Sequence, residues 1–94
     1  MIRNVVMMKL KPNYDATLLD ELIDRLKRLC CPGTLSYTVG LDAGLRQGNW
    51  TLAIVADFTD TSAYRAYDDD TRHNQIRAEL GPLIDEVARA QFVL

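Results

Sequence analysis

Residues 2–10 read IRNVVMMKL and alternate with the period of two that a β-strand requires. One face of this predicted strand is apolar apart from a single amide, and it consists of Ile2, Asn4, Val6, Met8 and Leu10. The other face is mixed and holds Arg3, Val5, Met7 and Lys9. Pro12 and Asn13 then end the strand.

The period becomes helical from about Asp15 to Cys30. Leucines recur there at intervals of three and four, which predicts an amphipathic helix with one apolar stripe. The stripe consists of Leu18, Leu22, Leu26 and Leu29. The segment 31–33, Cys-Pro-Gly, ends the helix because proline cannot continue it and glycine tolerates the turn that follows.

Two more strands are predicted at 34–41 and 50–58, on either side of a glycine-containing loop at 42–49. In the first, the expected inward residues are Leu35, Tyr37, Val39 and Leu41. In the second, they are Trp50, Leu52, Ile54, Ala56 and Phe58.

A second helical region follows these strands, and the segment 60–62, Asp-Thr-Ser, can cap a helix that carries Tyr64 and Tyr67. The acidic run 68–70 interrupts this helix, and Thr71 is expected to cap a continuation that carries His73. The segment 81–82, Gly-Pro, ends the helical region, and a last strand is predicted at about 87–94.

The predicted order is β-α-β-β-α-β, a ferredoxin-like α+β fold in which both helical regions cover one face of a four-stranded antiparallel sheet. Residues 1–94 are expected to form a single domain. The uncovered face still carries apolar residues on its central strands, namely Val5, Met7, Ala53 and Val55. An exposed apolar surface of this kind normally marks an interaction site, and a second copy of the chain can cover it symmetrically. We therefore expect a homodimer, as a dimeric α+β barrel.

Composition excludes several classes of function. The 94 residues are 48% hydrophobic and 26% charged, with a formal charge of −2, and they contain no basic stripe of the kind that nucleic acid requires. No stretch is apolar enough to cross a membrane, and no signal peptide is visible. The two cysteines, Cys30 and Cys31, are adjacent and are expected to be free thiols in a reducing cytoplasm. One histidine and two adjacent cysteines cannot supply a zinc site, so we expect no bound metal.

A polar group on or above the apolar core face is the candidate site. His73 is the only side chain whose ordinary pKa suits proton transfer at neutral pH. Asn4 must either form a hydrogen bond or line a cavity, because burying an unpaired amide costs roughly 1–3 kcal/mol. Tyr67 is the third candidate catalytic residue. The residues expected to bind substrate are Met8, Tyr37, Trp50 and Leu52. Read one at a time, these residues also fit a purely structural role, with His73 at the surface and the two helical tyrosines in the core.

The opening segment 1–12, the strand 50–58, the stretch Tyr67 to His73 and the ending 87–92 together resemble the stress-responsive dimeric α/β-barrel (Dabb) family. The resemblance implies two ferredoxin-like subunits with their sheets face to face. It also implies a cofactor-free acid–base site, because a plant polyketide cyclase of the family uses one histidine on the first strand and a second after the tyrosine of the second helix. Tyr67 and His73 match the family's Tyr-x-x-His-Pro-x-His pattern, whereas Asp70 and Thr71 replace its His-Pro and Asn4 stands where many members have the first histidine.

Because an amide cannot carry a proton at neutral pH, a two-histidine mechanism is not available to this chain. The sequence leaves three functions open. The first is a dimeric barrel with a small hydrophobic pocket and cofactor-free catalysis on a small carbonyl compound, in which His73 is the single base and Tyr67 and Asn4 hold the substrate oxygen. The second is a non-catalytic module that binds a small hydrophobic molecule or acts in a stress response. The third is a haem-linked or monooxygenase-like dimeric barrel.

Overall fold

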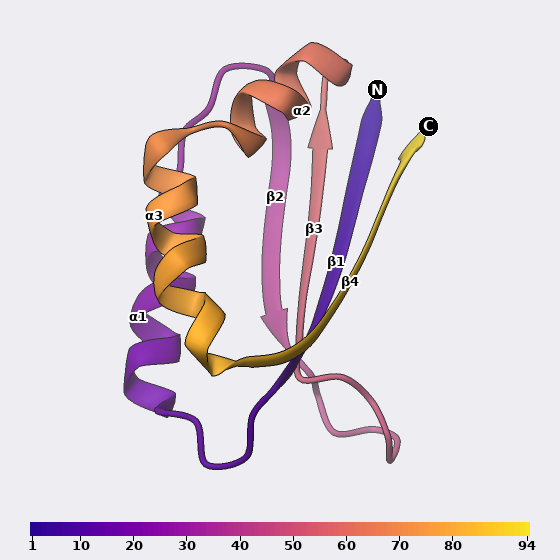
Figure 1. Ribbon diagram of the computed structural model, residues 1–94. Helices are drawn as coiled ribbons and strands as arrows, with labels where there is room; N and C mark the ends of the chain where they lie inside the picture. Colours follow the sequence, from indigo (N-terminus) through magenta and orange to yellow (C-terminus); the bar gives the residue numbers. More distant parts are fainter.

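The computed structural model describes residues 1–94, and the elements follow one another in the predicted order (Figure 1). The strands are β1 (Ile2–Leu10), β2 (Thr34–Leu41), β3 (Leu52–Phe58) and β4 (Ile84–Val93). The helices are α1 (Ala16–Lys27), α2 (Thr61–Asp68) and α3 (Thr71–Leu80), and a short 3₁₀ helix, η1 (Gly81–Leu83), precedes the last strand. The first helix is shorter than its apolar stripe predicts, and the last strand begins earlier than expected.

One four-stranded sheet has the order β2-β3-β1-β4, and every neighbouring pair is antiparallel. All three α-helices lie on one side of it, and the other side is open (Figure 1). The predicted ferredoxin-like α+β fold is confirmed. This topology places β1 in the interior of the sheet, and residues of β1 therefore have neighbours on both sides.

The core forms between the helix-covered faces of β1 and β3 and the buried face of α1, which consists of Leu19, Leu22, Ile23 and Leu26, whereas Leu18 and Leu29 of the predicted stripe are only partly buried. Val6 pairs with Ile54 and Met8 pairs with Leu52, so the four side chains project to the helix-covered face together. Leu22 of α1 packs over them with no exposed surface. No helix of the structure is both long and apolar enough to span a bilayer.

The register of β2 departs from the predicted alternation. Thr34 lies opposite Phe58 and Ser36 lies opposite Asp57, so Leu35 is an extra residue in the ladder. A bulge of this kind takes one residue out of the alternating pattern, and Leu35 is 54% exposed rather than inward. Leu41, at the far end of the strand, is also exposed rather than buried. Of the expected inward residues of β2, only Tyr37 and Val39 pack against the core.

Each helix is capped by an aspartate. Asp15 and Asp60 accept hydrogen bonds from backbone N–H groups three residues ahead, so the cap of α2 is Asp60, the first residue of the predicted capping segment 60–62. The third helix begins one residue earlier than expected. Its cap is Asp70, whose carboxylate accepts from the N–H of His73 at 3.0 Å, and Thr71 is the first helical residue.

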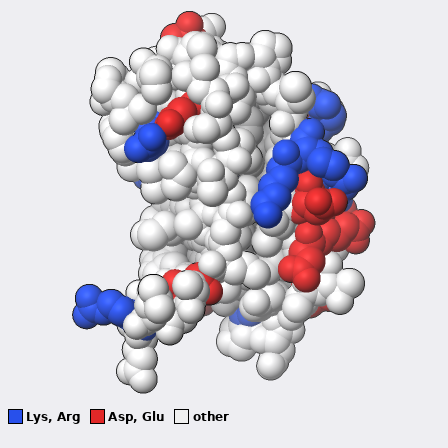
Figure 2. Space-filling view, turned by 180° about the vertical axis from the view of Figure 1, so that it is seen from behind, with Lys and Arg blue, Asp and Glu red and all other residues white.

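The open face of the sheet is apolar along its middle. Val5 pairs with Val55 and Met7 with Ala53, as the alternation predicts, and β4 adds Ala88, Ala90 and Phe92 on the same side. Met7 is 44% and Phe92 47% exposed. Seen from behind, charged side chains gather mainly on the helix side of the molecule (Figure 2). The apolar surface expected from the sequence is therefore present.

Candidate functional site

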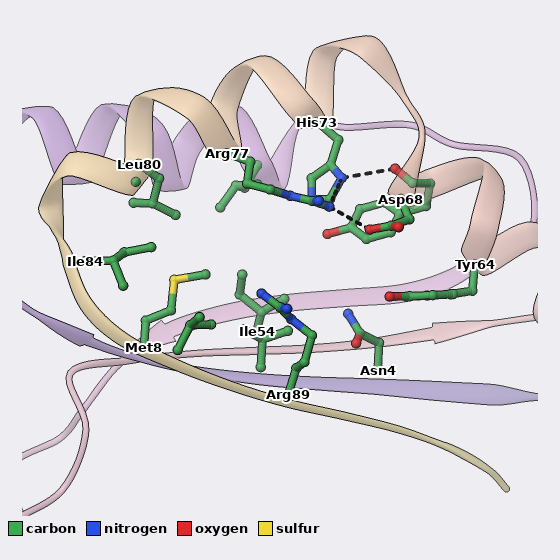
Figure 3. A pocket seen from close by; sticks show the side chains of 15 residues that line it. Asn4, Met8, Ile54, Tyr64, Asp68, His73, Arg77, Leu80, Ile84 and Arg89 are labelled. Carbon is green, nitrogen blue, oxygen red and sulfur yellow. Dashed lines mark hydrogen bonds and ion pairs between the residues drawn. The ribbon is translucent and has the colours of Figure 1, made fainter.

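A cavity of about 430 Å³ lies between the sheet and helices α2 and α3 (Figure 3). Ligand pockets typically measure about 300–1,000 Å³, so this volume suits one small molecule. One half of the cavity is apolar and is formed by Val6, Met8, Ile54, Leu80, Ile84 and Val87. The other half carries the polar side chains of Asn4, Tyr64, Asp68, His73, Arg77 and Arg89.

The break between α2 and α3 holds His73 in place. The Asp70 cap fixes the first turn of α3, and His73 is the residue whose N–H it accepts. The imidazole Nδ1 lies 3.0 Å from the carbonyl oxygen of Tyr67 in the last turn of α2. The two helices are thus joined through this side chain, which is buried and lines the cavity.

Two groups lie within hydrogen-bond distance of the imidazole Nδ1: the Tyr67 carbonyl oxygen and the Arg77 guanidinium, which is 3.1 Å away. The Tyr67 carbonyl belongs to the fixed backbone, whereas Arg77 is about half exposed and donates to Asp68 at 2.7 Å. We therefore assign the proton to Nδ1, which donates to Tyr67. In this tautomer Nε2 is an acceptor, and it has no hydrogen-bond partner in the protein.

Burial lowers the pKa of His73, and the positive charge of Arg77 lowers it further. The side chain is therefore neutral at pH 7. A neutral imidazole with a free Nε2 facing a cavity is a competent proton acceptor.

Asn4 lies on β1 below the histidine and is only 3% exposed. Its Oδ1 accepts a hydrogen bond of 2.8 Å from Nε2 of Gln91, its partner on β4. The amide nitrogen of Asn4 makes no hydrogen bond within the protein and points into the cavity (Figure 3). Asn4 is thus both bonded and cavity-lining, and it retains a free donor.

The two tyrosines of α2, Tyr64 and Tyr67, have different positions relative to the cavity. The hydroxyl of Tyr67 lies 2.7 Å from the hydroxyl of Tyr37, and its ring stacks on the imidazole of His73 at 4.0 Å between centroids. Tyr64 instead turns its hydroxyl toward Asn4 and the cavity (Figure 3). Burial raises the pKa of Tyr64, so its hydroxyl stays protonated. Tyr64, rather than Tyr67, is placed to donate a hydrogen bond to a ligand.

The remaining predicted residues divide between the cavity and its surroundings. Met8 lines it. Tyr37 reaches it only through Tyr67, and Leu52 is buried in the core behind it. Trp50 precedes β3 and lies over the opposite, open face of the sheet, beside Met7 and Val55. β3 begins at Leu52, so the alternation of the strand does not reach Trp50, and the predicted inward position of Trp50 is wrong.

Four polar residues of the cavity wall are not among the predicted site residues, namely Tyr64, Asp68, Arg77 and Arg89. Arg77 lies four residues after His73, the helical spacing that places two side chains on one face. Arg89 pairs with Val6 across the sheet, which turns it toward the cavity. The spacing signal was present for Arg77, whereas Arg89 depends on the register of β4.

The folded chain is a ferredoxin-like domain that encloses a cavity between its sheet and its second helical region. A family model described as the stress responsive A/B barrel domain (Dabb) matches residues 2–94. The chain belongs to this family, as the resemblance in its sequence indicated.

Solved structures with the same fold cover nearly the whole chain. A dimeric ferredoxin-like protein of unknown function from Thermobifida fusca is 28% identical, with a TM-score of 0.92, over 99% of this chain and 90% of that one. A hydroxynitrile lyase from Passiflora edulis is 16% identical, with a TM-score of 0.84, over 99% and 92%. The protein At3g17210 of Arabidopsis thaliana is 19% identical, with a TM-score of 0.79, over 100% and 95%. No curated protein shows significant sequence similarity to the chain.

Proposed function

We propose that this protein catalyses cofactor-free acid–base chemistry on a small carbonyl compound, with His73 as the only base. The observation that carries the proposal is the unpartnered Nε2 of a neutral, buried imidazole at the wall of the cavity. General-base catalysis by a positioned histidine contributes about 10²–10⁴-fold to a rate. Around it, Asn4 and Tyr64 offer the hydrogen-bond donors that a developing oxyanion requires.

The proposed step needs no oxidant or reductant. Nε2 of His73 takes a proton from the carbon beside a carbonyl group, and the electron pair of that C–H bond moves into the carbonyl to form an enolate. The amide N–H of Asn4 and the hydroxyl of Tyr64 donate to the enolate oxygen. The enolate carbon then attacks a second carbonyl of the same molecule, and protonated His73 returns its proton to the new alkoxide.

Two further observations support the proposal. The Passiflora edulis neighbour is a hydroxynitrile lyase, so another protein of this fold has lyase activity. The stacked ring and carbonyl of Tyr67 also hold the imidazole in one tautomer, which is the usual role of a group that orients a catalytic base. We assign Tyr67 this positioning role in place of the substrate contact expected from the sequence.

The test is turnover of a panel of linear diketones and polyketide-type thioesters, followed by product mass spectrometry. His73→Gln is expected to lower kcat by about 10²–10⁴-fold, and Asn4→Ala by a smaller factor. Asn74→Ala is the matched control, because Asn74 is exposed on the same helix and lies outside the cavity. Wild-type turnover that survives both His73→Gln and Asn4→Ala unchanged would end this proposal.

The alternatives are separated by two measurements. A binding module would retain a native ligand on purification, visible by native mass spectrometry, and would show no turnover of any compound in the panel. A haem-linked protein would show a saturable change in the haem absorbance band on titration. Neither alternative has a specific observation in its favour.

We also propose that the chain forms a homodimer through the open face of its sheet. The apolar strip formed by Val5, Met7, Ala53 and Val55 continues onto β4 and is solvent-exposed in the single chain. The Thermobifida fusca protein is described as dimeric. Two such sheets placed face to face would form a barrel and leave the helix-side cavity of each subunit free.

A further inference from the structure

The cavity carries a positive charge that nothing in the protein neutralises. Arg77 is paired with Asp68 at 2.7 Å, and His73 is neutral. Arg89, on β4, forms no ion pair, although it lines the same cavity. Its guanidinium points between the apolar and the polar half (Figure 3). The charges of Asp68 and Arg77 cancel, so the wall carries a net positive charge, which is that of the Arg89 guanidinium.

Apart from Nε2 of His73, the side chains of the wall that lack a hydrogen-bond partner offer donors. Asn4 is a buried residue whose amide nitrogen reaches the cavity and has no partner in the protein. The Tyr64 hydroxyl, held protonated by burial, also has none. The one carboxylate on the wall, Asp68, is already occupied by Arg77. A site with free donors and a free guanidinium selects a ligand that accepts hydrogen bonds and carries negative charge.

The opposite half of the cavity selects an apolar body. Met8, Leu80 and Ile84 lie together at the far end from Tyr64 and Asn4 (Figure 3). Since Arg89 comes from the edge strand β4, whose residues are nearly all exposed, its guanidinium stands where the cavity meets solvent. A charged end can remain at this mouth while the rest of the molecule is buried.

From these observations we infer that the pocket takes an amphipathic carboxylate, whose carboxylate binds Arg89 at the β4 edge and whose apolar body packs on Met8, Leu80 and Ile84. The inference rests on the proposed function because it describes the substrate class of the same cavity. A guanidinium can bind a carboxylate through two parallel hydrogen bonds, and a neutral amide cannot replace that geometry.

The test compares octanoate with octanamide, a neutral molecule of the same shape, by isothermal titration calorimetry. Wild-type protein is expected to bind octanoate about tenfold or more tightly than octanamide, and added salt should reduce the difference. Arg89→Gln is expected to remove the preference and leave octanamide binding unchanged. Arg65→Gln is the matched control, because Arg65 is an exposed arginine of α2 that lies outside the cavity.

Three results would overturn the inference: equal affinity of the wild type for the two probes, an unchanged octanoate preference in Arg89→Gln, or no saturable octanoate binding. Failure of the catalytic proposal is distinguishable from these outcomes. His73→Gln is expected to retain Arg89-dependent octanoate binding, so loss of the acid–base proposal alone would leave the octanoate preference in place.

Discussion

The imidazole of His73 is held twice by the same residue, Tyr67. The two rings stack at 4.0 Å between centroids with 26° between their planes, and Nδ1 of His73 lies 3.0 Å from the Tyr67 carbonyl oxygen. Neither contact uses the tyrosine hydroxyl, which instead lies 2.7 Å from the hydroxyl of Tyr37. A substitution can therefore remove the Tyr67 hydroxyl without removing either contact to His73.

Tyr67→Phe is expected to leave turnover close to that of the wild type, because the ring and the backbone carbonyl remain. It is expected to lower the free energy of unfolding by about 1–3 kcal/mol, because the partly buried Tyr37 hydroxyl loses its partner. Tyr67→Leu removes the stacked ring and should lower kcat as well. Chemical denaturation and steady-state kinetics on the same preparations check both expectations.

The control for the hydroxyl pair is the double variant Tyr37→Phe/Tyr67→Phe. Removing both partners leaves no unpaired group, so the double variant should be more stable than Tyr67→Phe alone. A large loss of kcat in Tyr67→Phe with stability unchanged would instead show that the hydroxyl contacts the substrate.

The depressed pKa of His73 predicts how stability depends on pH. In the unfolded chain its pKa is near the ordinary value of 6.5, and in the folded protein burial and Arg77 lower it. Between these two values the unfolded state binds more protons, so stability rises with pH there. The contribution is complete above about pH 6.5 and is lost as the pH falls through the folded value.

Denaturation midpoints measured from pH 7.5 down to pH 5 check this slope, with His73→Gln as the variant that should lack it. The carboxylates whose pKa values are lowered, Asp57, Asp70 and Glu79, titrate at lower pH and contribute little in this window. A wild-type slope that persists in His73→Gln would mean that another group is responsible.

Much of the fold follows from local pattern. The alternation of residues 2–10 assigned both faces of β1 correctly, because an alternating strand has only two faces and one of them is nearly all apolar. Errors arose where a single residue breaks the period. The bulge at Leu35 and the start of β3 at Leu52, two residues after Trp50, are set by pairing between strands, which a linear sequence does not display.

The site was less predictable than the fold for the same reason. His73 and Asn4 were selected because their chemistry is unusual on an apolar face, and the cavity brings both onto its wall. Arg89 was not selected, since an arginine on an edge strand is ordinarily a solvated residue. Its position on the wall depends on pairing with Val6, more than eighty residues earlier in the chain.

The homodimer proposal makes a sharp prediction for Val55, which lies at the centre of the open face opposite Val5. Val55→Asp would place an unpaired carboxylate in the interface and is expected to convert the dimer to a monomer. Asn4→Ala changes the helix side of the same sheet and should leave the dimer intact. Light scattering coupled to size-exclusion chromatography measures both, and the reverse outcome would show that the two faces were assigned wrongly.

The ion pair between Arg3 and Asp57 tests how far that interface extends. Two hydrogen bonds of 2.8 Å join the guanidinium to the carboxylate across β1 and β3, on the open face. If a second subunit covers the pair, removing one partner leaves an uncompensated charge in the interface, whereas removing both does not. Arg3→Ala and Asp57→Ala should therefore each weaken the dimer by about tenfold or more, and the double variant should be less affected than either.

The matched control is the other ion pair of this face, between Lys9 and Glu86, whose charged atoms are 3.8 Å apart and whose side chains are more than half exposed. Substitutions there are expected to change the dissociation constant little, because an exposed pair is already solvated. Sedimentation equilibrium gives the constant for each variant. If the Arg3 and Asp57 substitutions behave like those at Lys9 and Glu86, with additive and small effects, the partner does not cover this corner of the sheet. The interface would then be confined to the apolar strip around Val55.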